Sequence, residues 1–474
     1  MPPSLALFLW FVLLLALLRF DPAREPRTSL ALWVPAIWIF IVGSRLPSQW
    51  LGGQVAVVAS ALEEGNPLDR SIYLVLILLA FGILVSRSFD WGKFCVANVA
   101  LTAFLSFALL SVLWSDFPFV AFKRWFRDLG TYVVILVALS DSRRFEAART
   151  LLRRLYFLLI PLCLLLNKYF PGISKGYDPW TGQGYFTGAT TSKNMLGVLC
   201  LVGGLFFFWD IFMRWGDRKE RRTRWIIGVN VALFAMTLQL MSQAGSATSN
   251  VCLMLGCVVI ALAHSNTVKQ SPTLLLVLIP VGICLYLFLE FGFGIDIIGF
   301  VSKAVGRTSD LTGRTEIWRV VLSTNTDPYV GTGYESFWLG PRLQWIWKET
   351  VHVNEAHNGY LEVYLTLGLI GLSLLAGFLI ASYRNICRRF RGSAGFGSLS
   401  LALWTVLLFY NVTESAFRGH LIWVVFLLEV IAVPGSRERS EPTSRALPGE
   451  PSSEVRNDVT VIEASAVGSA SRLM

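Results

Sequence analysis

Residues able to carry chemistry gather in Val351–Tyr364 (VHVNEAHNGYLEVY), directly before an apolar run. His357 lies in this stretch, and an imidazole can act as a general base because its ordinary pKa is ~6.5. Glu355, or Glu362 about one helical turn further on, can orient the ring, and Asn358 flanks it. The alternative is that His357 only caps or anchors the helix that follows. Spacing alone leaves both readings open.

Two arginines beside glycines form a second candidate group, in the triplets Gly306-Arg307-Thr308 and Gly313-Arg314-Thr315. Arginine suits bidentate phosphate binding, and the neighbouring glycine permits close approach of the backbone. The alternative role is attraction to anionic lipid headgroups, worth about 1 kcal/mol per residue near a membrane surface. We expect Arg314 and Arg307 to bind a phosphate group.

Further basic residues are predicted on the same side of the protein. Residues 115–127 (SDFPFVAFKRWFR) are expected to form a short loop, in which Arg124 and Arg127 have the spacing of one helix face. Lys193 and Asn194 open another predicted helix, and a lysine at that end opposes the helix dipole. The lysine therefore indicates an anion nearby, although a solvated lysine at the membrane interface is an equal alternative.

Several enzyme classes lack their signatures in this sequence. It has no DxD, HExxH, P-loop or GxSxG motif. Its seven cysteines form no CxxC pair and lie in or beside apolar spans, where they are typical of small hydrophobic residues. We therefore expect no metal site and no cofactor.

The composition predicts an all-α polytopic membrane protein. Hydrophobic residues make up 54% of the chain and charged residues 15%, whereas soluble domains carry roughly 25% charged residues. The formal net charge of +10 does not indicate nucleic-acid binding, because the basic residues cluster in short loops between apolar spans. We expect about twelve or thirteen transmembrane helices, at 5–20, 29–44, 71–86, 96–114, 128–140, 155–168, 194–212, 225–241, 249–264, 273–290, 363–383, 397–413 and 419–433.

Basic connections set the predicted orientation and the division of the chain. Arginine-rich loops after residues 142, 213 and 383 are placed in the cytoplasm by the positive-inside rule. About ten helices then fill 1–290, one large periplasmic loop spans 291–362, and further transmembrane helices fill 363–433. The Ser-, Glu- and Pro-rich segment 434–474 is predicted to be a disordered cytoplasmic tail. The expected location is a bacterial inner membrane, with the active face periplasmic.

Several motifs resemble the O-antigen ligase and O-antigen polymerase superfamily. Near the histidine these are Ala356-His357-Asn358-Gly359-Tyr360-Leu361 and Leu367-Gly368-Leu369-Ile370-Gly371. Before it, in the family's order, come Ser111–Ser115 (SVLWS), Ser192–Gly197 (SKNMLG), Thr312–Trp318 (TGRTEIW) and Gly331–Trp338 (GTGYESFW). Gly65–Arg70 (GNPLDR) is most similar to the exopolysaccharide-production branch. The resemblance covers roughly residues 60–430.

This resemblance implies a metal-independent, inverting glycosyltransferase with a GT-C-like fold. The donor would be a glycan on undecaprenyl diphosphate, and the acceptor would be lipid A–core or another lipid-linked glycan. His357 matches the family histidine proposed to activate the acceptor hydroxyl, and Arg314 matches an arginine thought to hold the diphosphate. Lys193 stands where relatives often carry a basic residue before Asn194, and we add Arg124 from its charge and position.

Three rival functions remain open from sequence. The first is a polymerase of exopolysaccharide repeat units, which differs only in the acceptor. The second is a transporter of lipid-linked glycans, which is disfavoured because the predicted spans show no inverted repeat and almost no mid-helix charge. The third is a membrane scaffold without catalysis. Beyond glycans, the partners expected are membrane lipids and no nucleic acid.

Overall fold

The computed structural model describes residues 1–433 except for short gaps, and its described residues are mainly helical. The gaps are residues 22, 24–28, 53–64, 142, 178–181, 183, 290–292, 294–310 and 351–352. The predicted tail 434–474 and Arg307 lie outside the described residues. The all-α fold class is confirmed, with one addition that the sequence did not predict: the strands β1 (Lys175–Tyr177) and β2 (Gly184–Phe186) form an antiparallel pair.

Each of the thirteen predicted spans corresponds to a helix or a helix pair. In chain order the main helices are α1 (Pro3–Phe20), α2 (Trp33–Gly43), α5 (Pro67–Ser86), α6 (Trp91–Ala97), α7 (Val99–Leu110), α8 (Pro118–Leu139), α9 (Arg144–Tyr169), α11 (Lys193–Arg214), α12 (Arg221–Ala244), α13 (Ala247–Ala263), α15 (Pro272–Leu287), α17 (Leu311–Leu322), α18 (Gly340–Glu349), α19 (Gly359–Gly392), α20 (Ala394–Thr413) and α21 (Leu421–Val430). Short helices α3 (Pro47–Trp50), α10 (Pro171–Ser174) and α14 (Asn266–Gln270), with 3-10 turns at Leu30–Leu32, Ser111–Trp114 and Trp215–Asp217, complete the list.

Six of these helices are long and apolar enough to cross a membrane, and the described part of the chain is that of a multi-pass membrane protein. They are α1, α5, α9, α11, α12 and α19. The pair formed by α6 and the helix Val99–Trp114, bent by 101°, is also long and apolar enough, and has the shape of either a broken span or a re-entrant loop. Five shorter apolar helices, which include α13, α15 and α21, accompany them. The predicted total of twelve or thirteen spans stays a prediction.

The bend between α6 and α7 has a local cause at Asn98. Its side-chain amide donates to the carbonyl of Ala432 at 2.8 Å, and its side-chain oxygen accepts from the amide of Ala432 at 3.1 Å. The same amide nitrogen also donates to the carbonyl of Phe94. The backbone of Asn98 leaves the helical conformation, with φ −126° and ψ 42°, and its side chain joins this break to the segment after α21.

The expected loop at 115–127 is wrong, because α8 begins at Pro118 and includes Lys123, Arg124 and Arg127. Proline is favoured in the first turn of a helix, and the basic residues extend the helix beyond its apolar part. A reading based on hydropathy stops where the charges begin. It therefore placed the start of the span at residue 128 and missed almost three turns.

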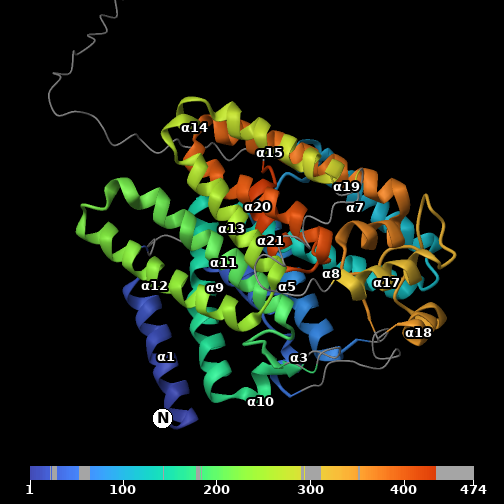
Figure 1. Ribbon diagram of the computed structural model, residues 1–474, viewed down its shortest axis with the longest axis horizontal. Helices are drawn as coiled ribbons and strands as arrows, with labels where there is room; N and C mark the ends of the chain where they lie inside the picture. The colour runs from blue at the N-terminus through green and yellow to red at the C-terminus, as the bar shows by residue number, and fades with distance from the viewer. Residues whose placement is uncertain are drawn as a thin grey trace, which may run out of the picture. The chain divides into compact units, whose positions relative to one another are not determined.

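The most deeply buried helices lie in the middle of the bundle. Helix α11 packs against α12, α13 and α20, and most of α11 and nearly all of α21 are buried. Helix α1 is different, because it lies at the margin beside α9 with most of its side chains exposed (Figure 1). Exposed leucines and phenylalanines on α1 are what a lipid-facing helix presents.

The large segment 291–362 has a small hydrophobic core of its own in its described part. Helix α17 contributes Ile317 and Val321, and α18 contributes Leu343 and Ile346, which pack with Phe337, Trp338, Ala356 and Leu365. Figure 1 shows α17 and α18 close together at one margin of the bundle. Because Leu365 belongs to α19, this core packs the described part of the segment onto the start of that helix.

A break in α19 attaches this segment to the bundle. Gly368 has φ +63°, and a Cβ there would collide with the backbone of Tyr329 and Val330. Around the break, the amide of Gly333 donates to the carbonyl of Thr366 at 3.0 Å, and the amide of Leu369 donates to the carbonyl of Pro328 at 2.9 Å. Only glycine can adopt this φ and also allow so close an approach of the neighbouring backbone. The structure therefore explains why the motif Leu367–Gly371 has a glycine at position 368.

Candidate active site

The loop before α19 holds His357 in a defined and unusual backbone conformation. His357 has φ +49°, a region that costs a non-glycine residue energy unless the surroundings impose it. They do so at Ala356, whose amide donates to Glu362 at 2.5 Å and whose carbonyl accepts from the Trp318 indole at 2.8 Å. Glu362 therefore holds the backbone of the loop, whereas we had expected it as one way to orient the imidazole.

Asn358 caps the helix. Its side-chain oxygen accepts from the amide of Leu361 at 3.0 Å, and its side-chain nitrogen donates to the carbonyl of Val412 at 3.1 Å. The alternative role considered for His357, that of capping α19, is therefore taken by its neighbour. The His357 ring is left to face two carboxylates.

These carboxylates belong to Glu355 and Glu414. Nδ1 of His357 lies 3.1 Å from Oε1 of Glu355 and 3.6 Å from Oε2 of Glu414. Burial lowers the pKa of His357, but the two carboxylates outweigh it and raise that pKa to about 10. Burial conversely raises the pKa of Glu355, but the imidazolium beside it leaves the value below the ordinary one. At neutral pH the pair is therefore an imidazolium and a carboxylate.

Glu414 connects this histidine to two other predicted residues. It follows α20, is only 4% exposed, and accepts from Nη2 of Arg314 at 2.7 Å. The side-chain amide of Asn194, in the first turn of α11, donates to both of its oxygens at 3.0 Å. The backbone carbonyl of Glu414 accepts from the amide of Gly359 at 3.0 Å. Four elements far apart in sequence thus meet at one carboxylate.

Lys193, beside Asn194, lies at the start of α11, where Ser192 is the N-cap. Its ammonium group lies 5.4 Å from the centre of the Tyr185 ring on β2, within range of a cation–π contact. The strand pair that the sequence did not predict therefore positions this lysine. Lys193 precedes Asn194, which contacts Glu414, and it is a candidate for binding the donor.

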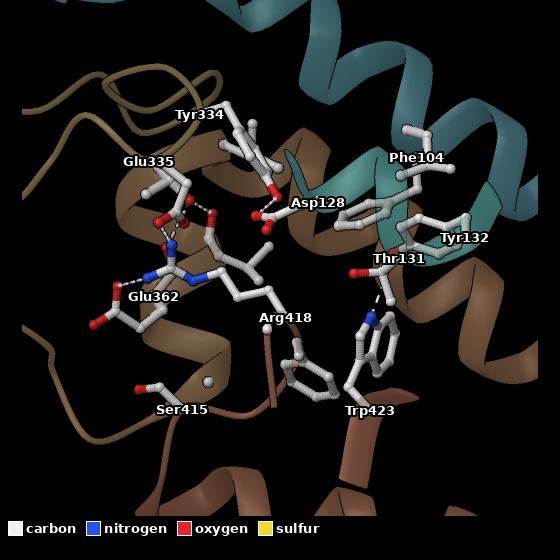
Figure 2. Close-up of a pocket in the computed structure, with 17 residues that line it drawn as sticks. Phe104, Asp128, Thr131, Tyr132, Tyr334, Glu335, Glu362, Ser415, Arg418 and Trp423 are labelled. Carbon is white, nitrogen blue, oxygen red and sulfur yellow. Dashed lines mark hydrogen bonds and ion pairs between the residues drawn. The ribbon is translucent and has the colours of Figure 1, made fainter. Parts of the chain in front are cut away.

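Arg124 lies beside a second group of polar residues. Its Nη1 donates to the carbonyl of Glu335 at 2.5 Å, and the Glu335 side chain forms an ion pair with Arg418. Figure 2 shows the Arg418 guanidinium between the carboxylates of Glu335 and Glu362. On the other side of the same pocket, the Tyr334 hydroxyl donates to Asp128 at 2.8 Å.

This pocket and the His357 cluster share their supporting residues. Glu362 lines the pocket and also holds the amide of Ala356, next to His357. Gly359 and Ser415 line it as well, and they neighbour the histidine loop and Glu414 respectively. Burial lowers the pKa of Arg418 to about 10, which leaves the guanidinium charged at neutral pH. A partly apolar pocket, in which the Arg418 guanidinium lies among three carboxylates, is therefore next to the histidine.

Glu355, His357 and Glu414 also have the geometry of a possible metal site. One ligand atom from each lies within 4.8 Å of the others. However, Glu414 already accepts from Arg314 and Asn194, and the imidazolium already lies between the carboxylates. Guanidinium and imidazolium groups therefore already lie against these carboxylates in the structure.

Sequence reasoning missed Glu414, Arg418, Glu335 and Asp128. A signal existed for the first two, since Thr413–His420 (TESAFRGH) is a polar run between the last two spans. The predicted helix count places that run on the same face as 291–362. For Asp128, the misplaced start of α8 hid its position inside a helix. Glu335 lies inside the motif Gly331–Trp338, but nothing in that motif indicated its ion pair with Arg418.

Comparison with known proteins gives two matches. Residues 244–376, which include Arg314 and His357, match a family model described as O-antigen ligase. The chain is also 28% identical over 297 residues to the exopolysaccharide production protein ExoQ of Rhizobium meliloti (strain 1021). That match covers 60% of this chain and 65% of the relative, slightly less than two thirds of its length. Both matches confirm the resemblance of this chain to the O-antigen ligase superfamily and to its exopolysaccharide-production branch.

Proposed function

We propose that this protein is an inner-membrane glycosyltransferase of polysaccharide biosynthesis, which transfers or polymerises a glycan from an undecaprenyl-diphosphate carrier. The observation that carries the proposal is the meeting of His357, Arg314 and Asn194 at Glu414, since His357 and Arg314 lie within the segment that matches the O-antigen ligase family. A base and a diphosphate-binding cation are the two groups that such a transfer needs.

His357 would act as the base through Nε2, since Nδ1 faces Glu355 and Glu414. Nε2 takes the proton of the acceptor hydroxyl while the hydroxyl oxygen attacks the anomeric carbon of the donor sugar. The carboxylates stabilise the imidazolium that forms, as the aspartate does in a serine-protease triad. Their cost is that the resting histidine is mostly protonated at neutral pH, so that only its neutral fraction can react.

Arg314 would neutralise the leaving group. As the bond between the anomeric carbon and the diphosphate oxygen breaks, negative charge develops on that oxygen, and a preorganised cation stabilises it. Lys193, Arg124 and Arg307 are the further candidates for binding the diphosphate. Attack from the face opposite the diphosphate inverts the anomeric configuration. Because the cations are side chains, the proposed reaction is independent of a metal ion.

A polymerase of exopolysaccharide repeat units is the second candidate. The name of the relative, an exopolysaccharide production protein, favours a lipid-linked glycan as acceptor over lipid A–core. The chemistry at His357 is the same in both cases, because each acceptor presents a sugar hydroxyl. We place the reaction on the periplasmic face of the membrane, where the donor carries its glycan.

Reconstitution of the full chain in proteoliposomes tests the proposal. With an undecaprenyl-diphosphate-linked oligosaccharide supplied, we expect release of undecaprenyl diphosphate and longer glycans, both unaffected by EDTA. His357→Ala should abolish both products while the protein stays folded in the membrane. Translocation of an intact lipid-linked glycan without release of the carrier would instead indicate a transporter, and loss of activity in EDTA would refute metal independence.

Deletion of the gene in its own host distinguishes the two acceptors. Accumulation of long, unligated lipid-linked polymer would identify a ligase. Accumulation of single lipid-linked repeat units would identify a polymerase. Unchanged glycans in both the deletion strain and a His357→Ala strain would contradict both assignments.

A further inference from the structure

A second polar cavity lies at the other end of α11 from the candidate active site. Asn194 at the start of α11 contacts Glu414, whereas Asp210 near its end is part of an arginine cluster. At a rise of 1.5 Å per residue, the two positions are about 24 Å apart along the helix. The cavity is lined by Asp21, Glu146, Arg149, Arg153, Arg154 and Arg214. The proposed reaction uses none of them.

Asp210 is the centre of this cluster and is already saturated. It is 1% exposed, and it accepts from Nε of Arg149 at 2.8 Å and from Nε of Arg214 at 3.1 Å. The Asn230 amide donates to it at 2.7 Å, and Nη1 of Arg153 lies 3.7 Å away. The Asp210 carboxylate thus lies against three guanidinium groups, and its acceptor positions are occupied.

Arg153 carries the clearest sign that something else binds here. It is 3% exposed, its Nε donates to Asp21 at 2.9 Å, and its Nη1 donates to Asn230 at 2.5 Å. Its Nη2 is buried and donates to no acceptor within the described residues. A buried guanidinium nitrogen without an acceptor is costly, and arginines lining a cavity normally direct such nitrogens at a ligand.

The charges in the cavity do not balance. Among the described ion pairs, the guanidinium groups of Arg149, Arg153 and Arg214 share only two carboxylates, those of Asp21 and Asp210. Glu146 also lines the cavity but forms an ion pair with Arg143 at 3.0 Å. Like charges so close together in a poorly solvated site repel strongly, and an anion removes that repulsion.

We propose that this cavity binds a phosphate group, which belongs to an anionic phospholipid headgroup or to a soluble phosphate compound. Phosphate oxygens accept from several guanidinium groups at once, and arginine is the residue best suited to hold them. Leu18 on the exposed helix α1 also lines the cavity, and α1 packs beside α9, which carries Arg149, Arg153 and Arg154. A lipid headgroup bound here has a lipid-facing helix beside it.

Binding to the purified full-length protein tests the inference, with two probes that separate the sources. Inorganic phosphate is titrated in detergent, and phosphatidylglycerol is supplied in phosphatidylcholine nanodiscs. Thermal unfolding and native mass spectrometry provide the readouts, since a ligand of the folded state raises the unfolding temperature. Arg154→Gln is the test variant because Arg154 does not contact Asp210 in any described bond. Arg218→Gln is its control, because Arg218 is exposed in the connection after α11 and lies outside the cavity lining.

We expect Arg154→Gln to weaken binding about tenfold, the usual effect of losing one charged hydrogen bond, and Arg218→Gln to leave it unchanged. Arg149→Lys, which keeps the charge beside Asp210 but loses the planar fork, should weaken binding as well. If Arg154→Gln does not fold, Arg149→Lys provides the test in its place. A difference seen with inorganic phosphate identifies a soluble ligand, and one seen only with phosphatidylglycerol identifies a lipid. If neither probe distinguishes these variants from the control, the inference is overturned.

Discussion

The Glu414 carboxylate lies 3.6 Å from the imidazole of His357, although α19 and α20 separate the two residues in the chain. The same carboxylate accepts from Arg314 and Asn194. A proposed base and a proposed diphosphate-binding cation are therefore positioned by one negative charge. Because this charge affects both groups, its removal should change the reaction without removing any group that reacts.

Glu414→Gln should lower kcat about 100-fold, at the lower end of what a positioned acid–base group contributes. The amide keeps the shape of the side chain but no longer stabilises the imidazolium or holds Arg314. Glu429→Gln is the control, since Glu429 lies at the far end of α21 and accepts from Ser400. Activity of reconstituted protein and its pH profile provide the measurement. A drop in kcat without a shift of the profile would mean a merely structural role.

The pH dependence of kcat/KM should show the basicity of His357. Its pKa of about 10 leaves the imidazolium dominant at neutral pH, so the reactive neutral form should increase about tenfold per pH unit until that value is reached. Glu355→Gln removes a carboxylate that raises this pKa, and the rising limb should move to lower pH. Glu349→Gln, at the exposed end of α18, should leave the profile in place. Activity that instead falls as pH rises would show that the protonated imidazolium is the active form.

Arg314→Lys should raise the KM for the lipid-diphosphate donor about tenfold, because lysine keeps the charge but loses the planar fork. The KM for the acceptor should not change. Arg319→Lys in the same helix is the matched control, since Arg319 is exposed. Steady-state kinetics with each substrate varied in turn give the result. Equal effects on both KM values would argue against a specific contact with the diphosphate.

The residues and helices best predicted from sequence were those with local signals. Long apolar runs located the helices, and the polar stretch before α19 located His357 and Glu355, which the structure brings together. Asn358 was predicted to support the site, and the reason it does so, a helix cap that also holds Val412, required the structure. Local sequence patterns carry this kind of information because caps and helices are short-range features.

Contacts between distant elements could not be predicted from a single sequence. Glu414 is a carboxylate between two apolar spans, and no spacing rule links it to Arg314 or Asn194. The start of α8 was missed because charged residues inside a helix look like a loop in a hydropathy pattern. Similarly, the strand that positions Lys193 is only three residues long, too short for alternation to be recognised.

Gly359→Ala should destabilise the protein by about 1–3 kcal/mol, the usual cost of overpacking. A Cβ at Gly359 would collide with the side chains of Asn411 at the end of α20 and Phe417 just after Glu414. Gly377→Ala in the same helix is the control, because a Cβ there meets nothing within 4 Å. Thermal unfolding in detergent gives the comparison. Equal unfolding temperatures for the two variants would show that α20 is not packed against the start of α19 as described.

Accessibility labelling should place the candidate site outside the cytoplasm, which the proposed reaction requires. Ser323→Cys, at the exposed end of α17, should react with a membrane-impermeant maleimide in intact spheroplasts. Lys219→Cys, in the exposed basic connection between α11 and α12, should react only after permeabilisation. The unsubstituted protein, with its seven native cysteines, measures the background. The opposite pattern would place His357 and Arg314 on the cytoplasmic side, away from a glycan carried on the outer leaflet, and the proposed donor would then be wrong.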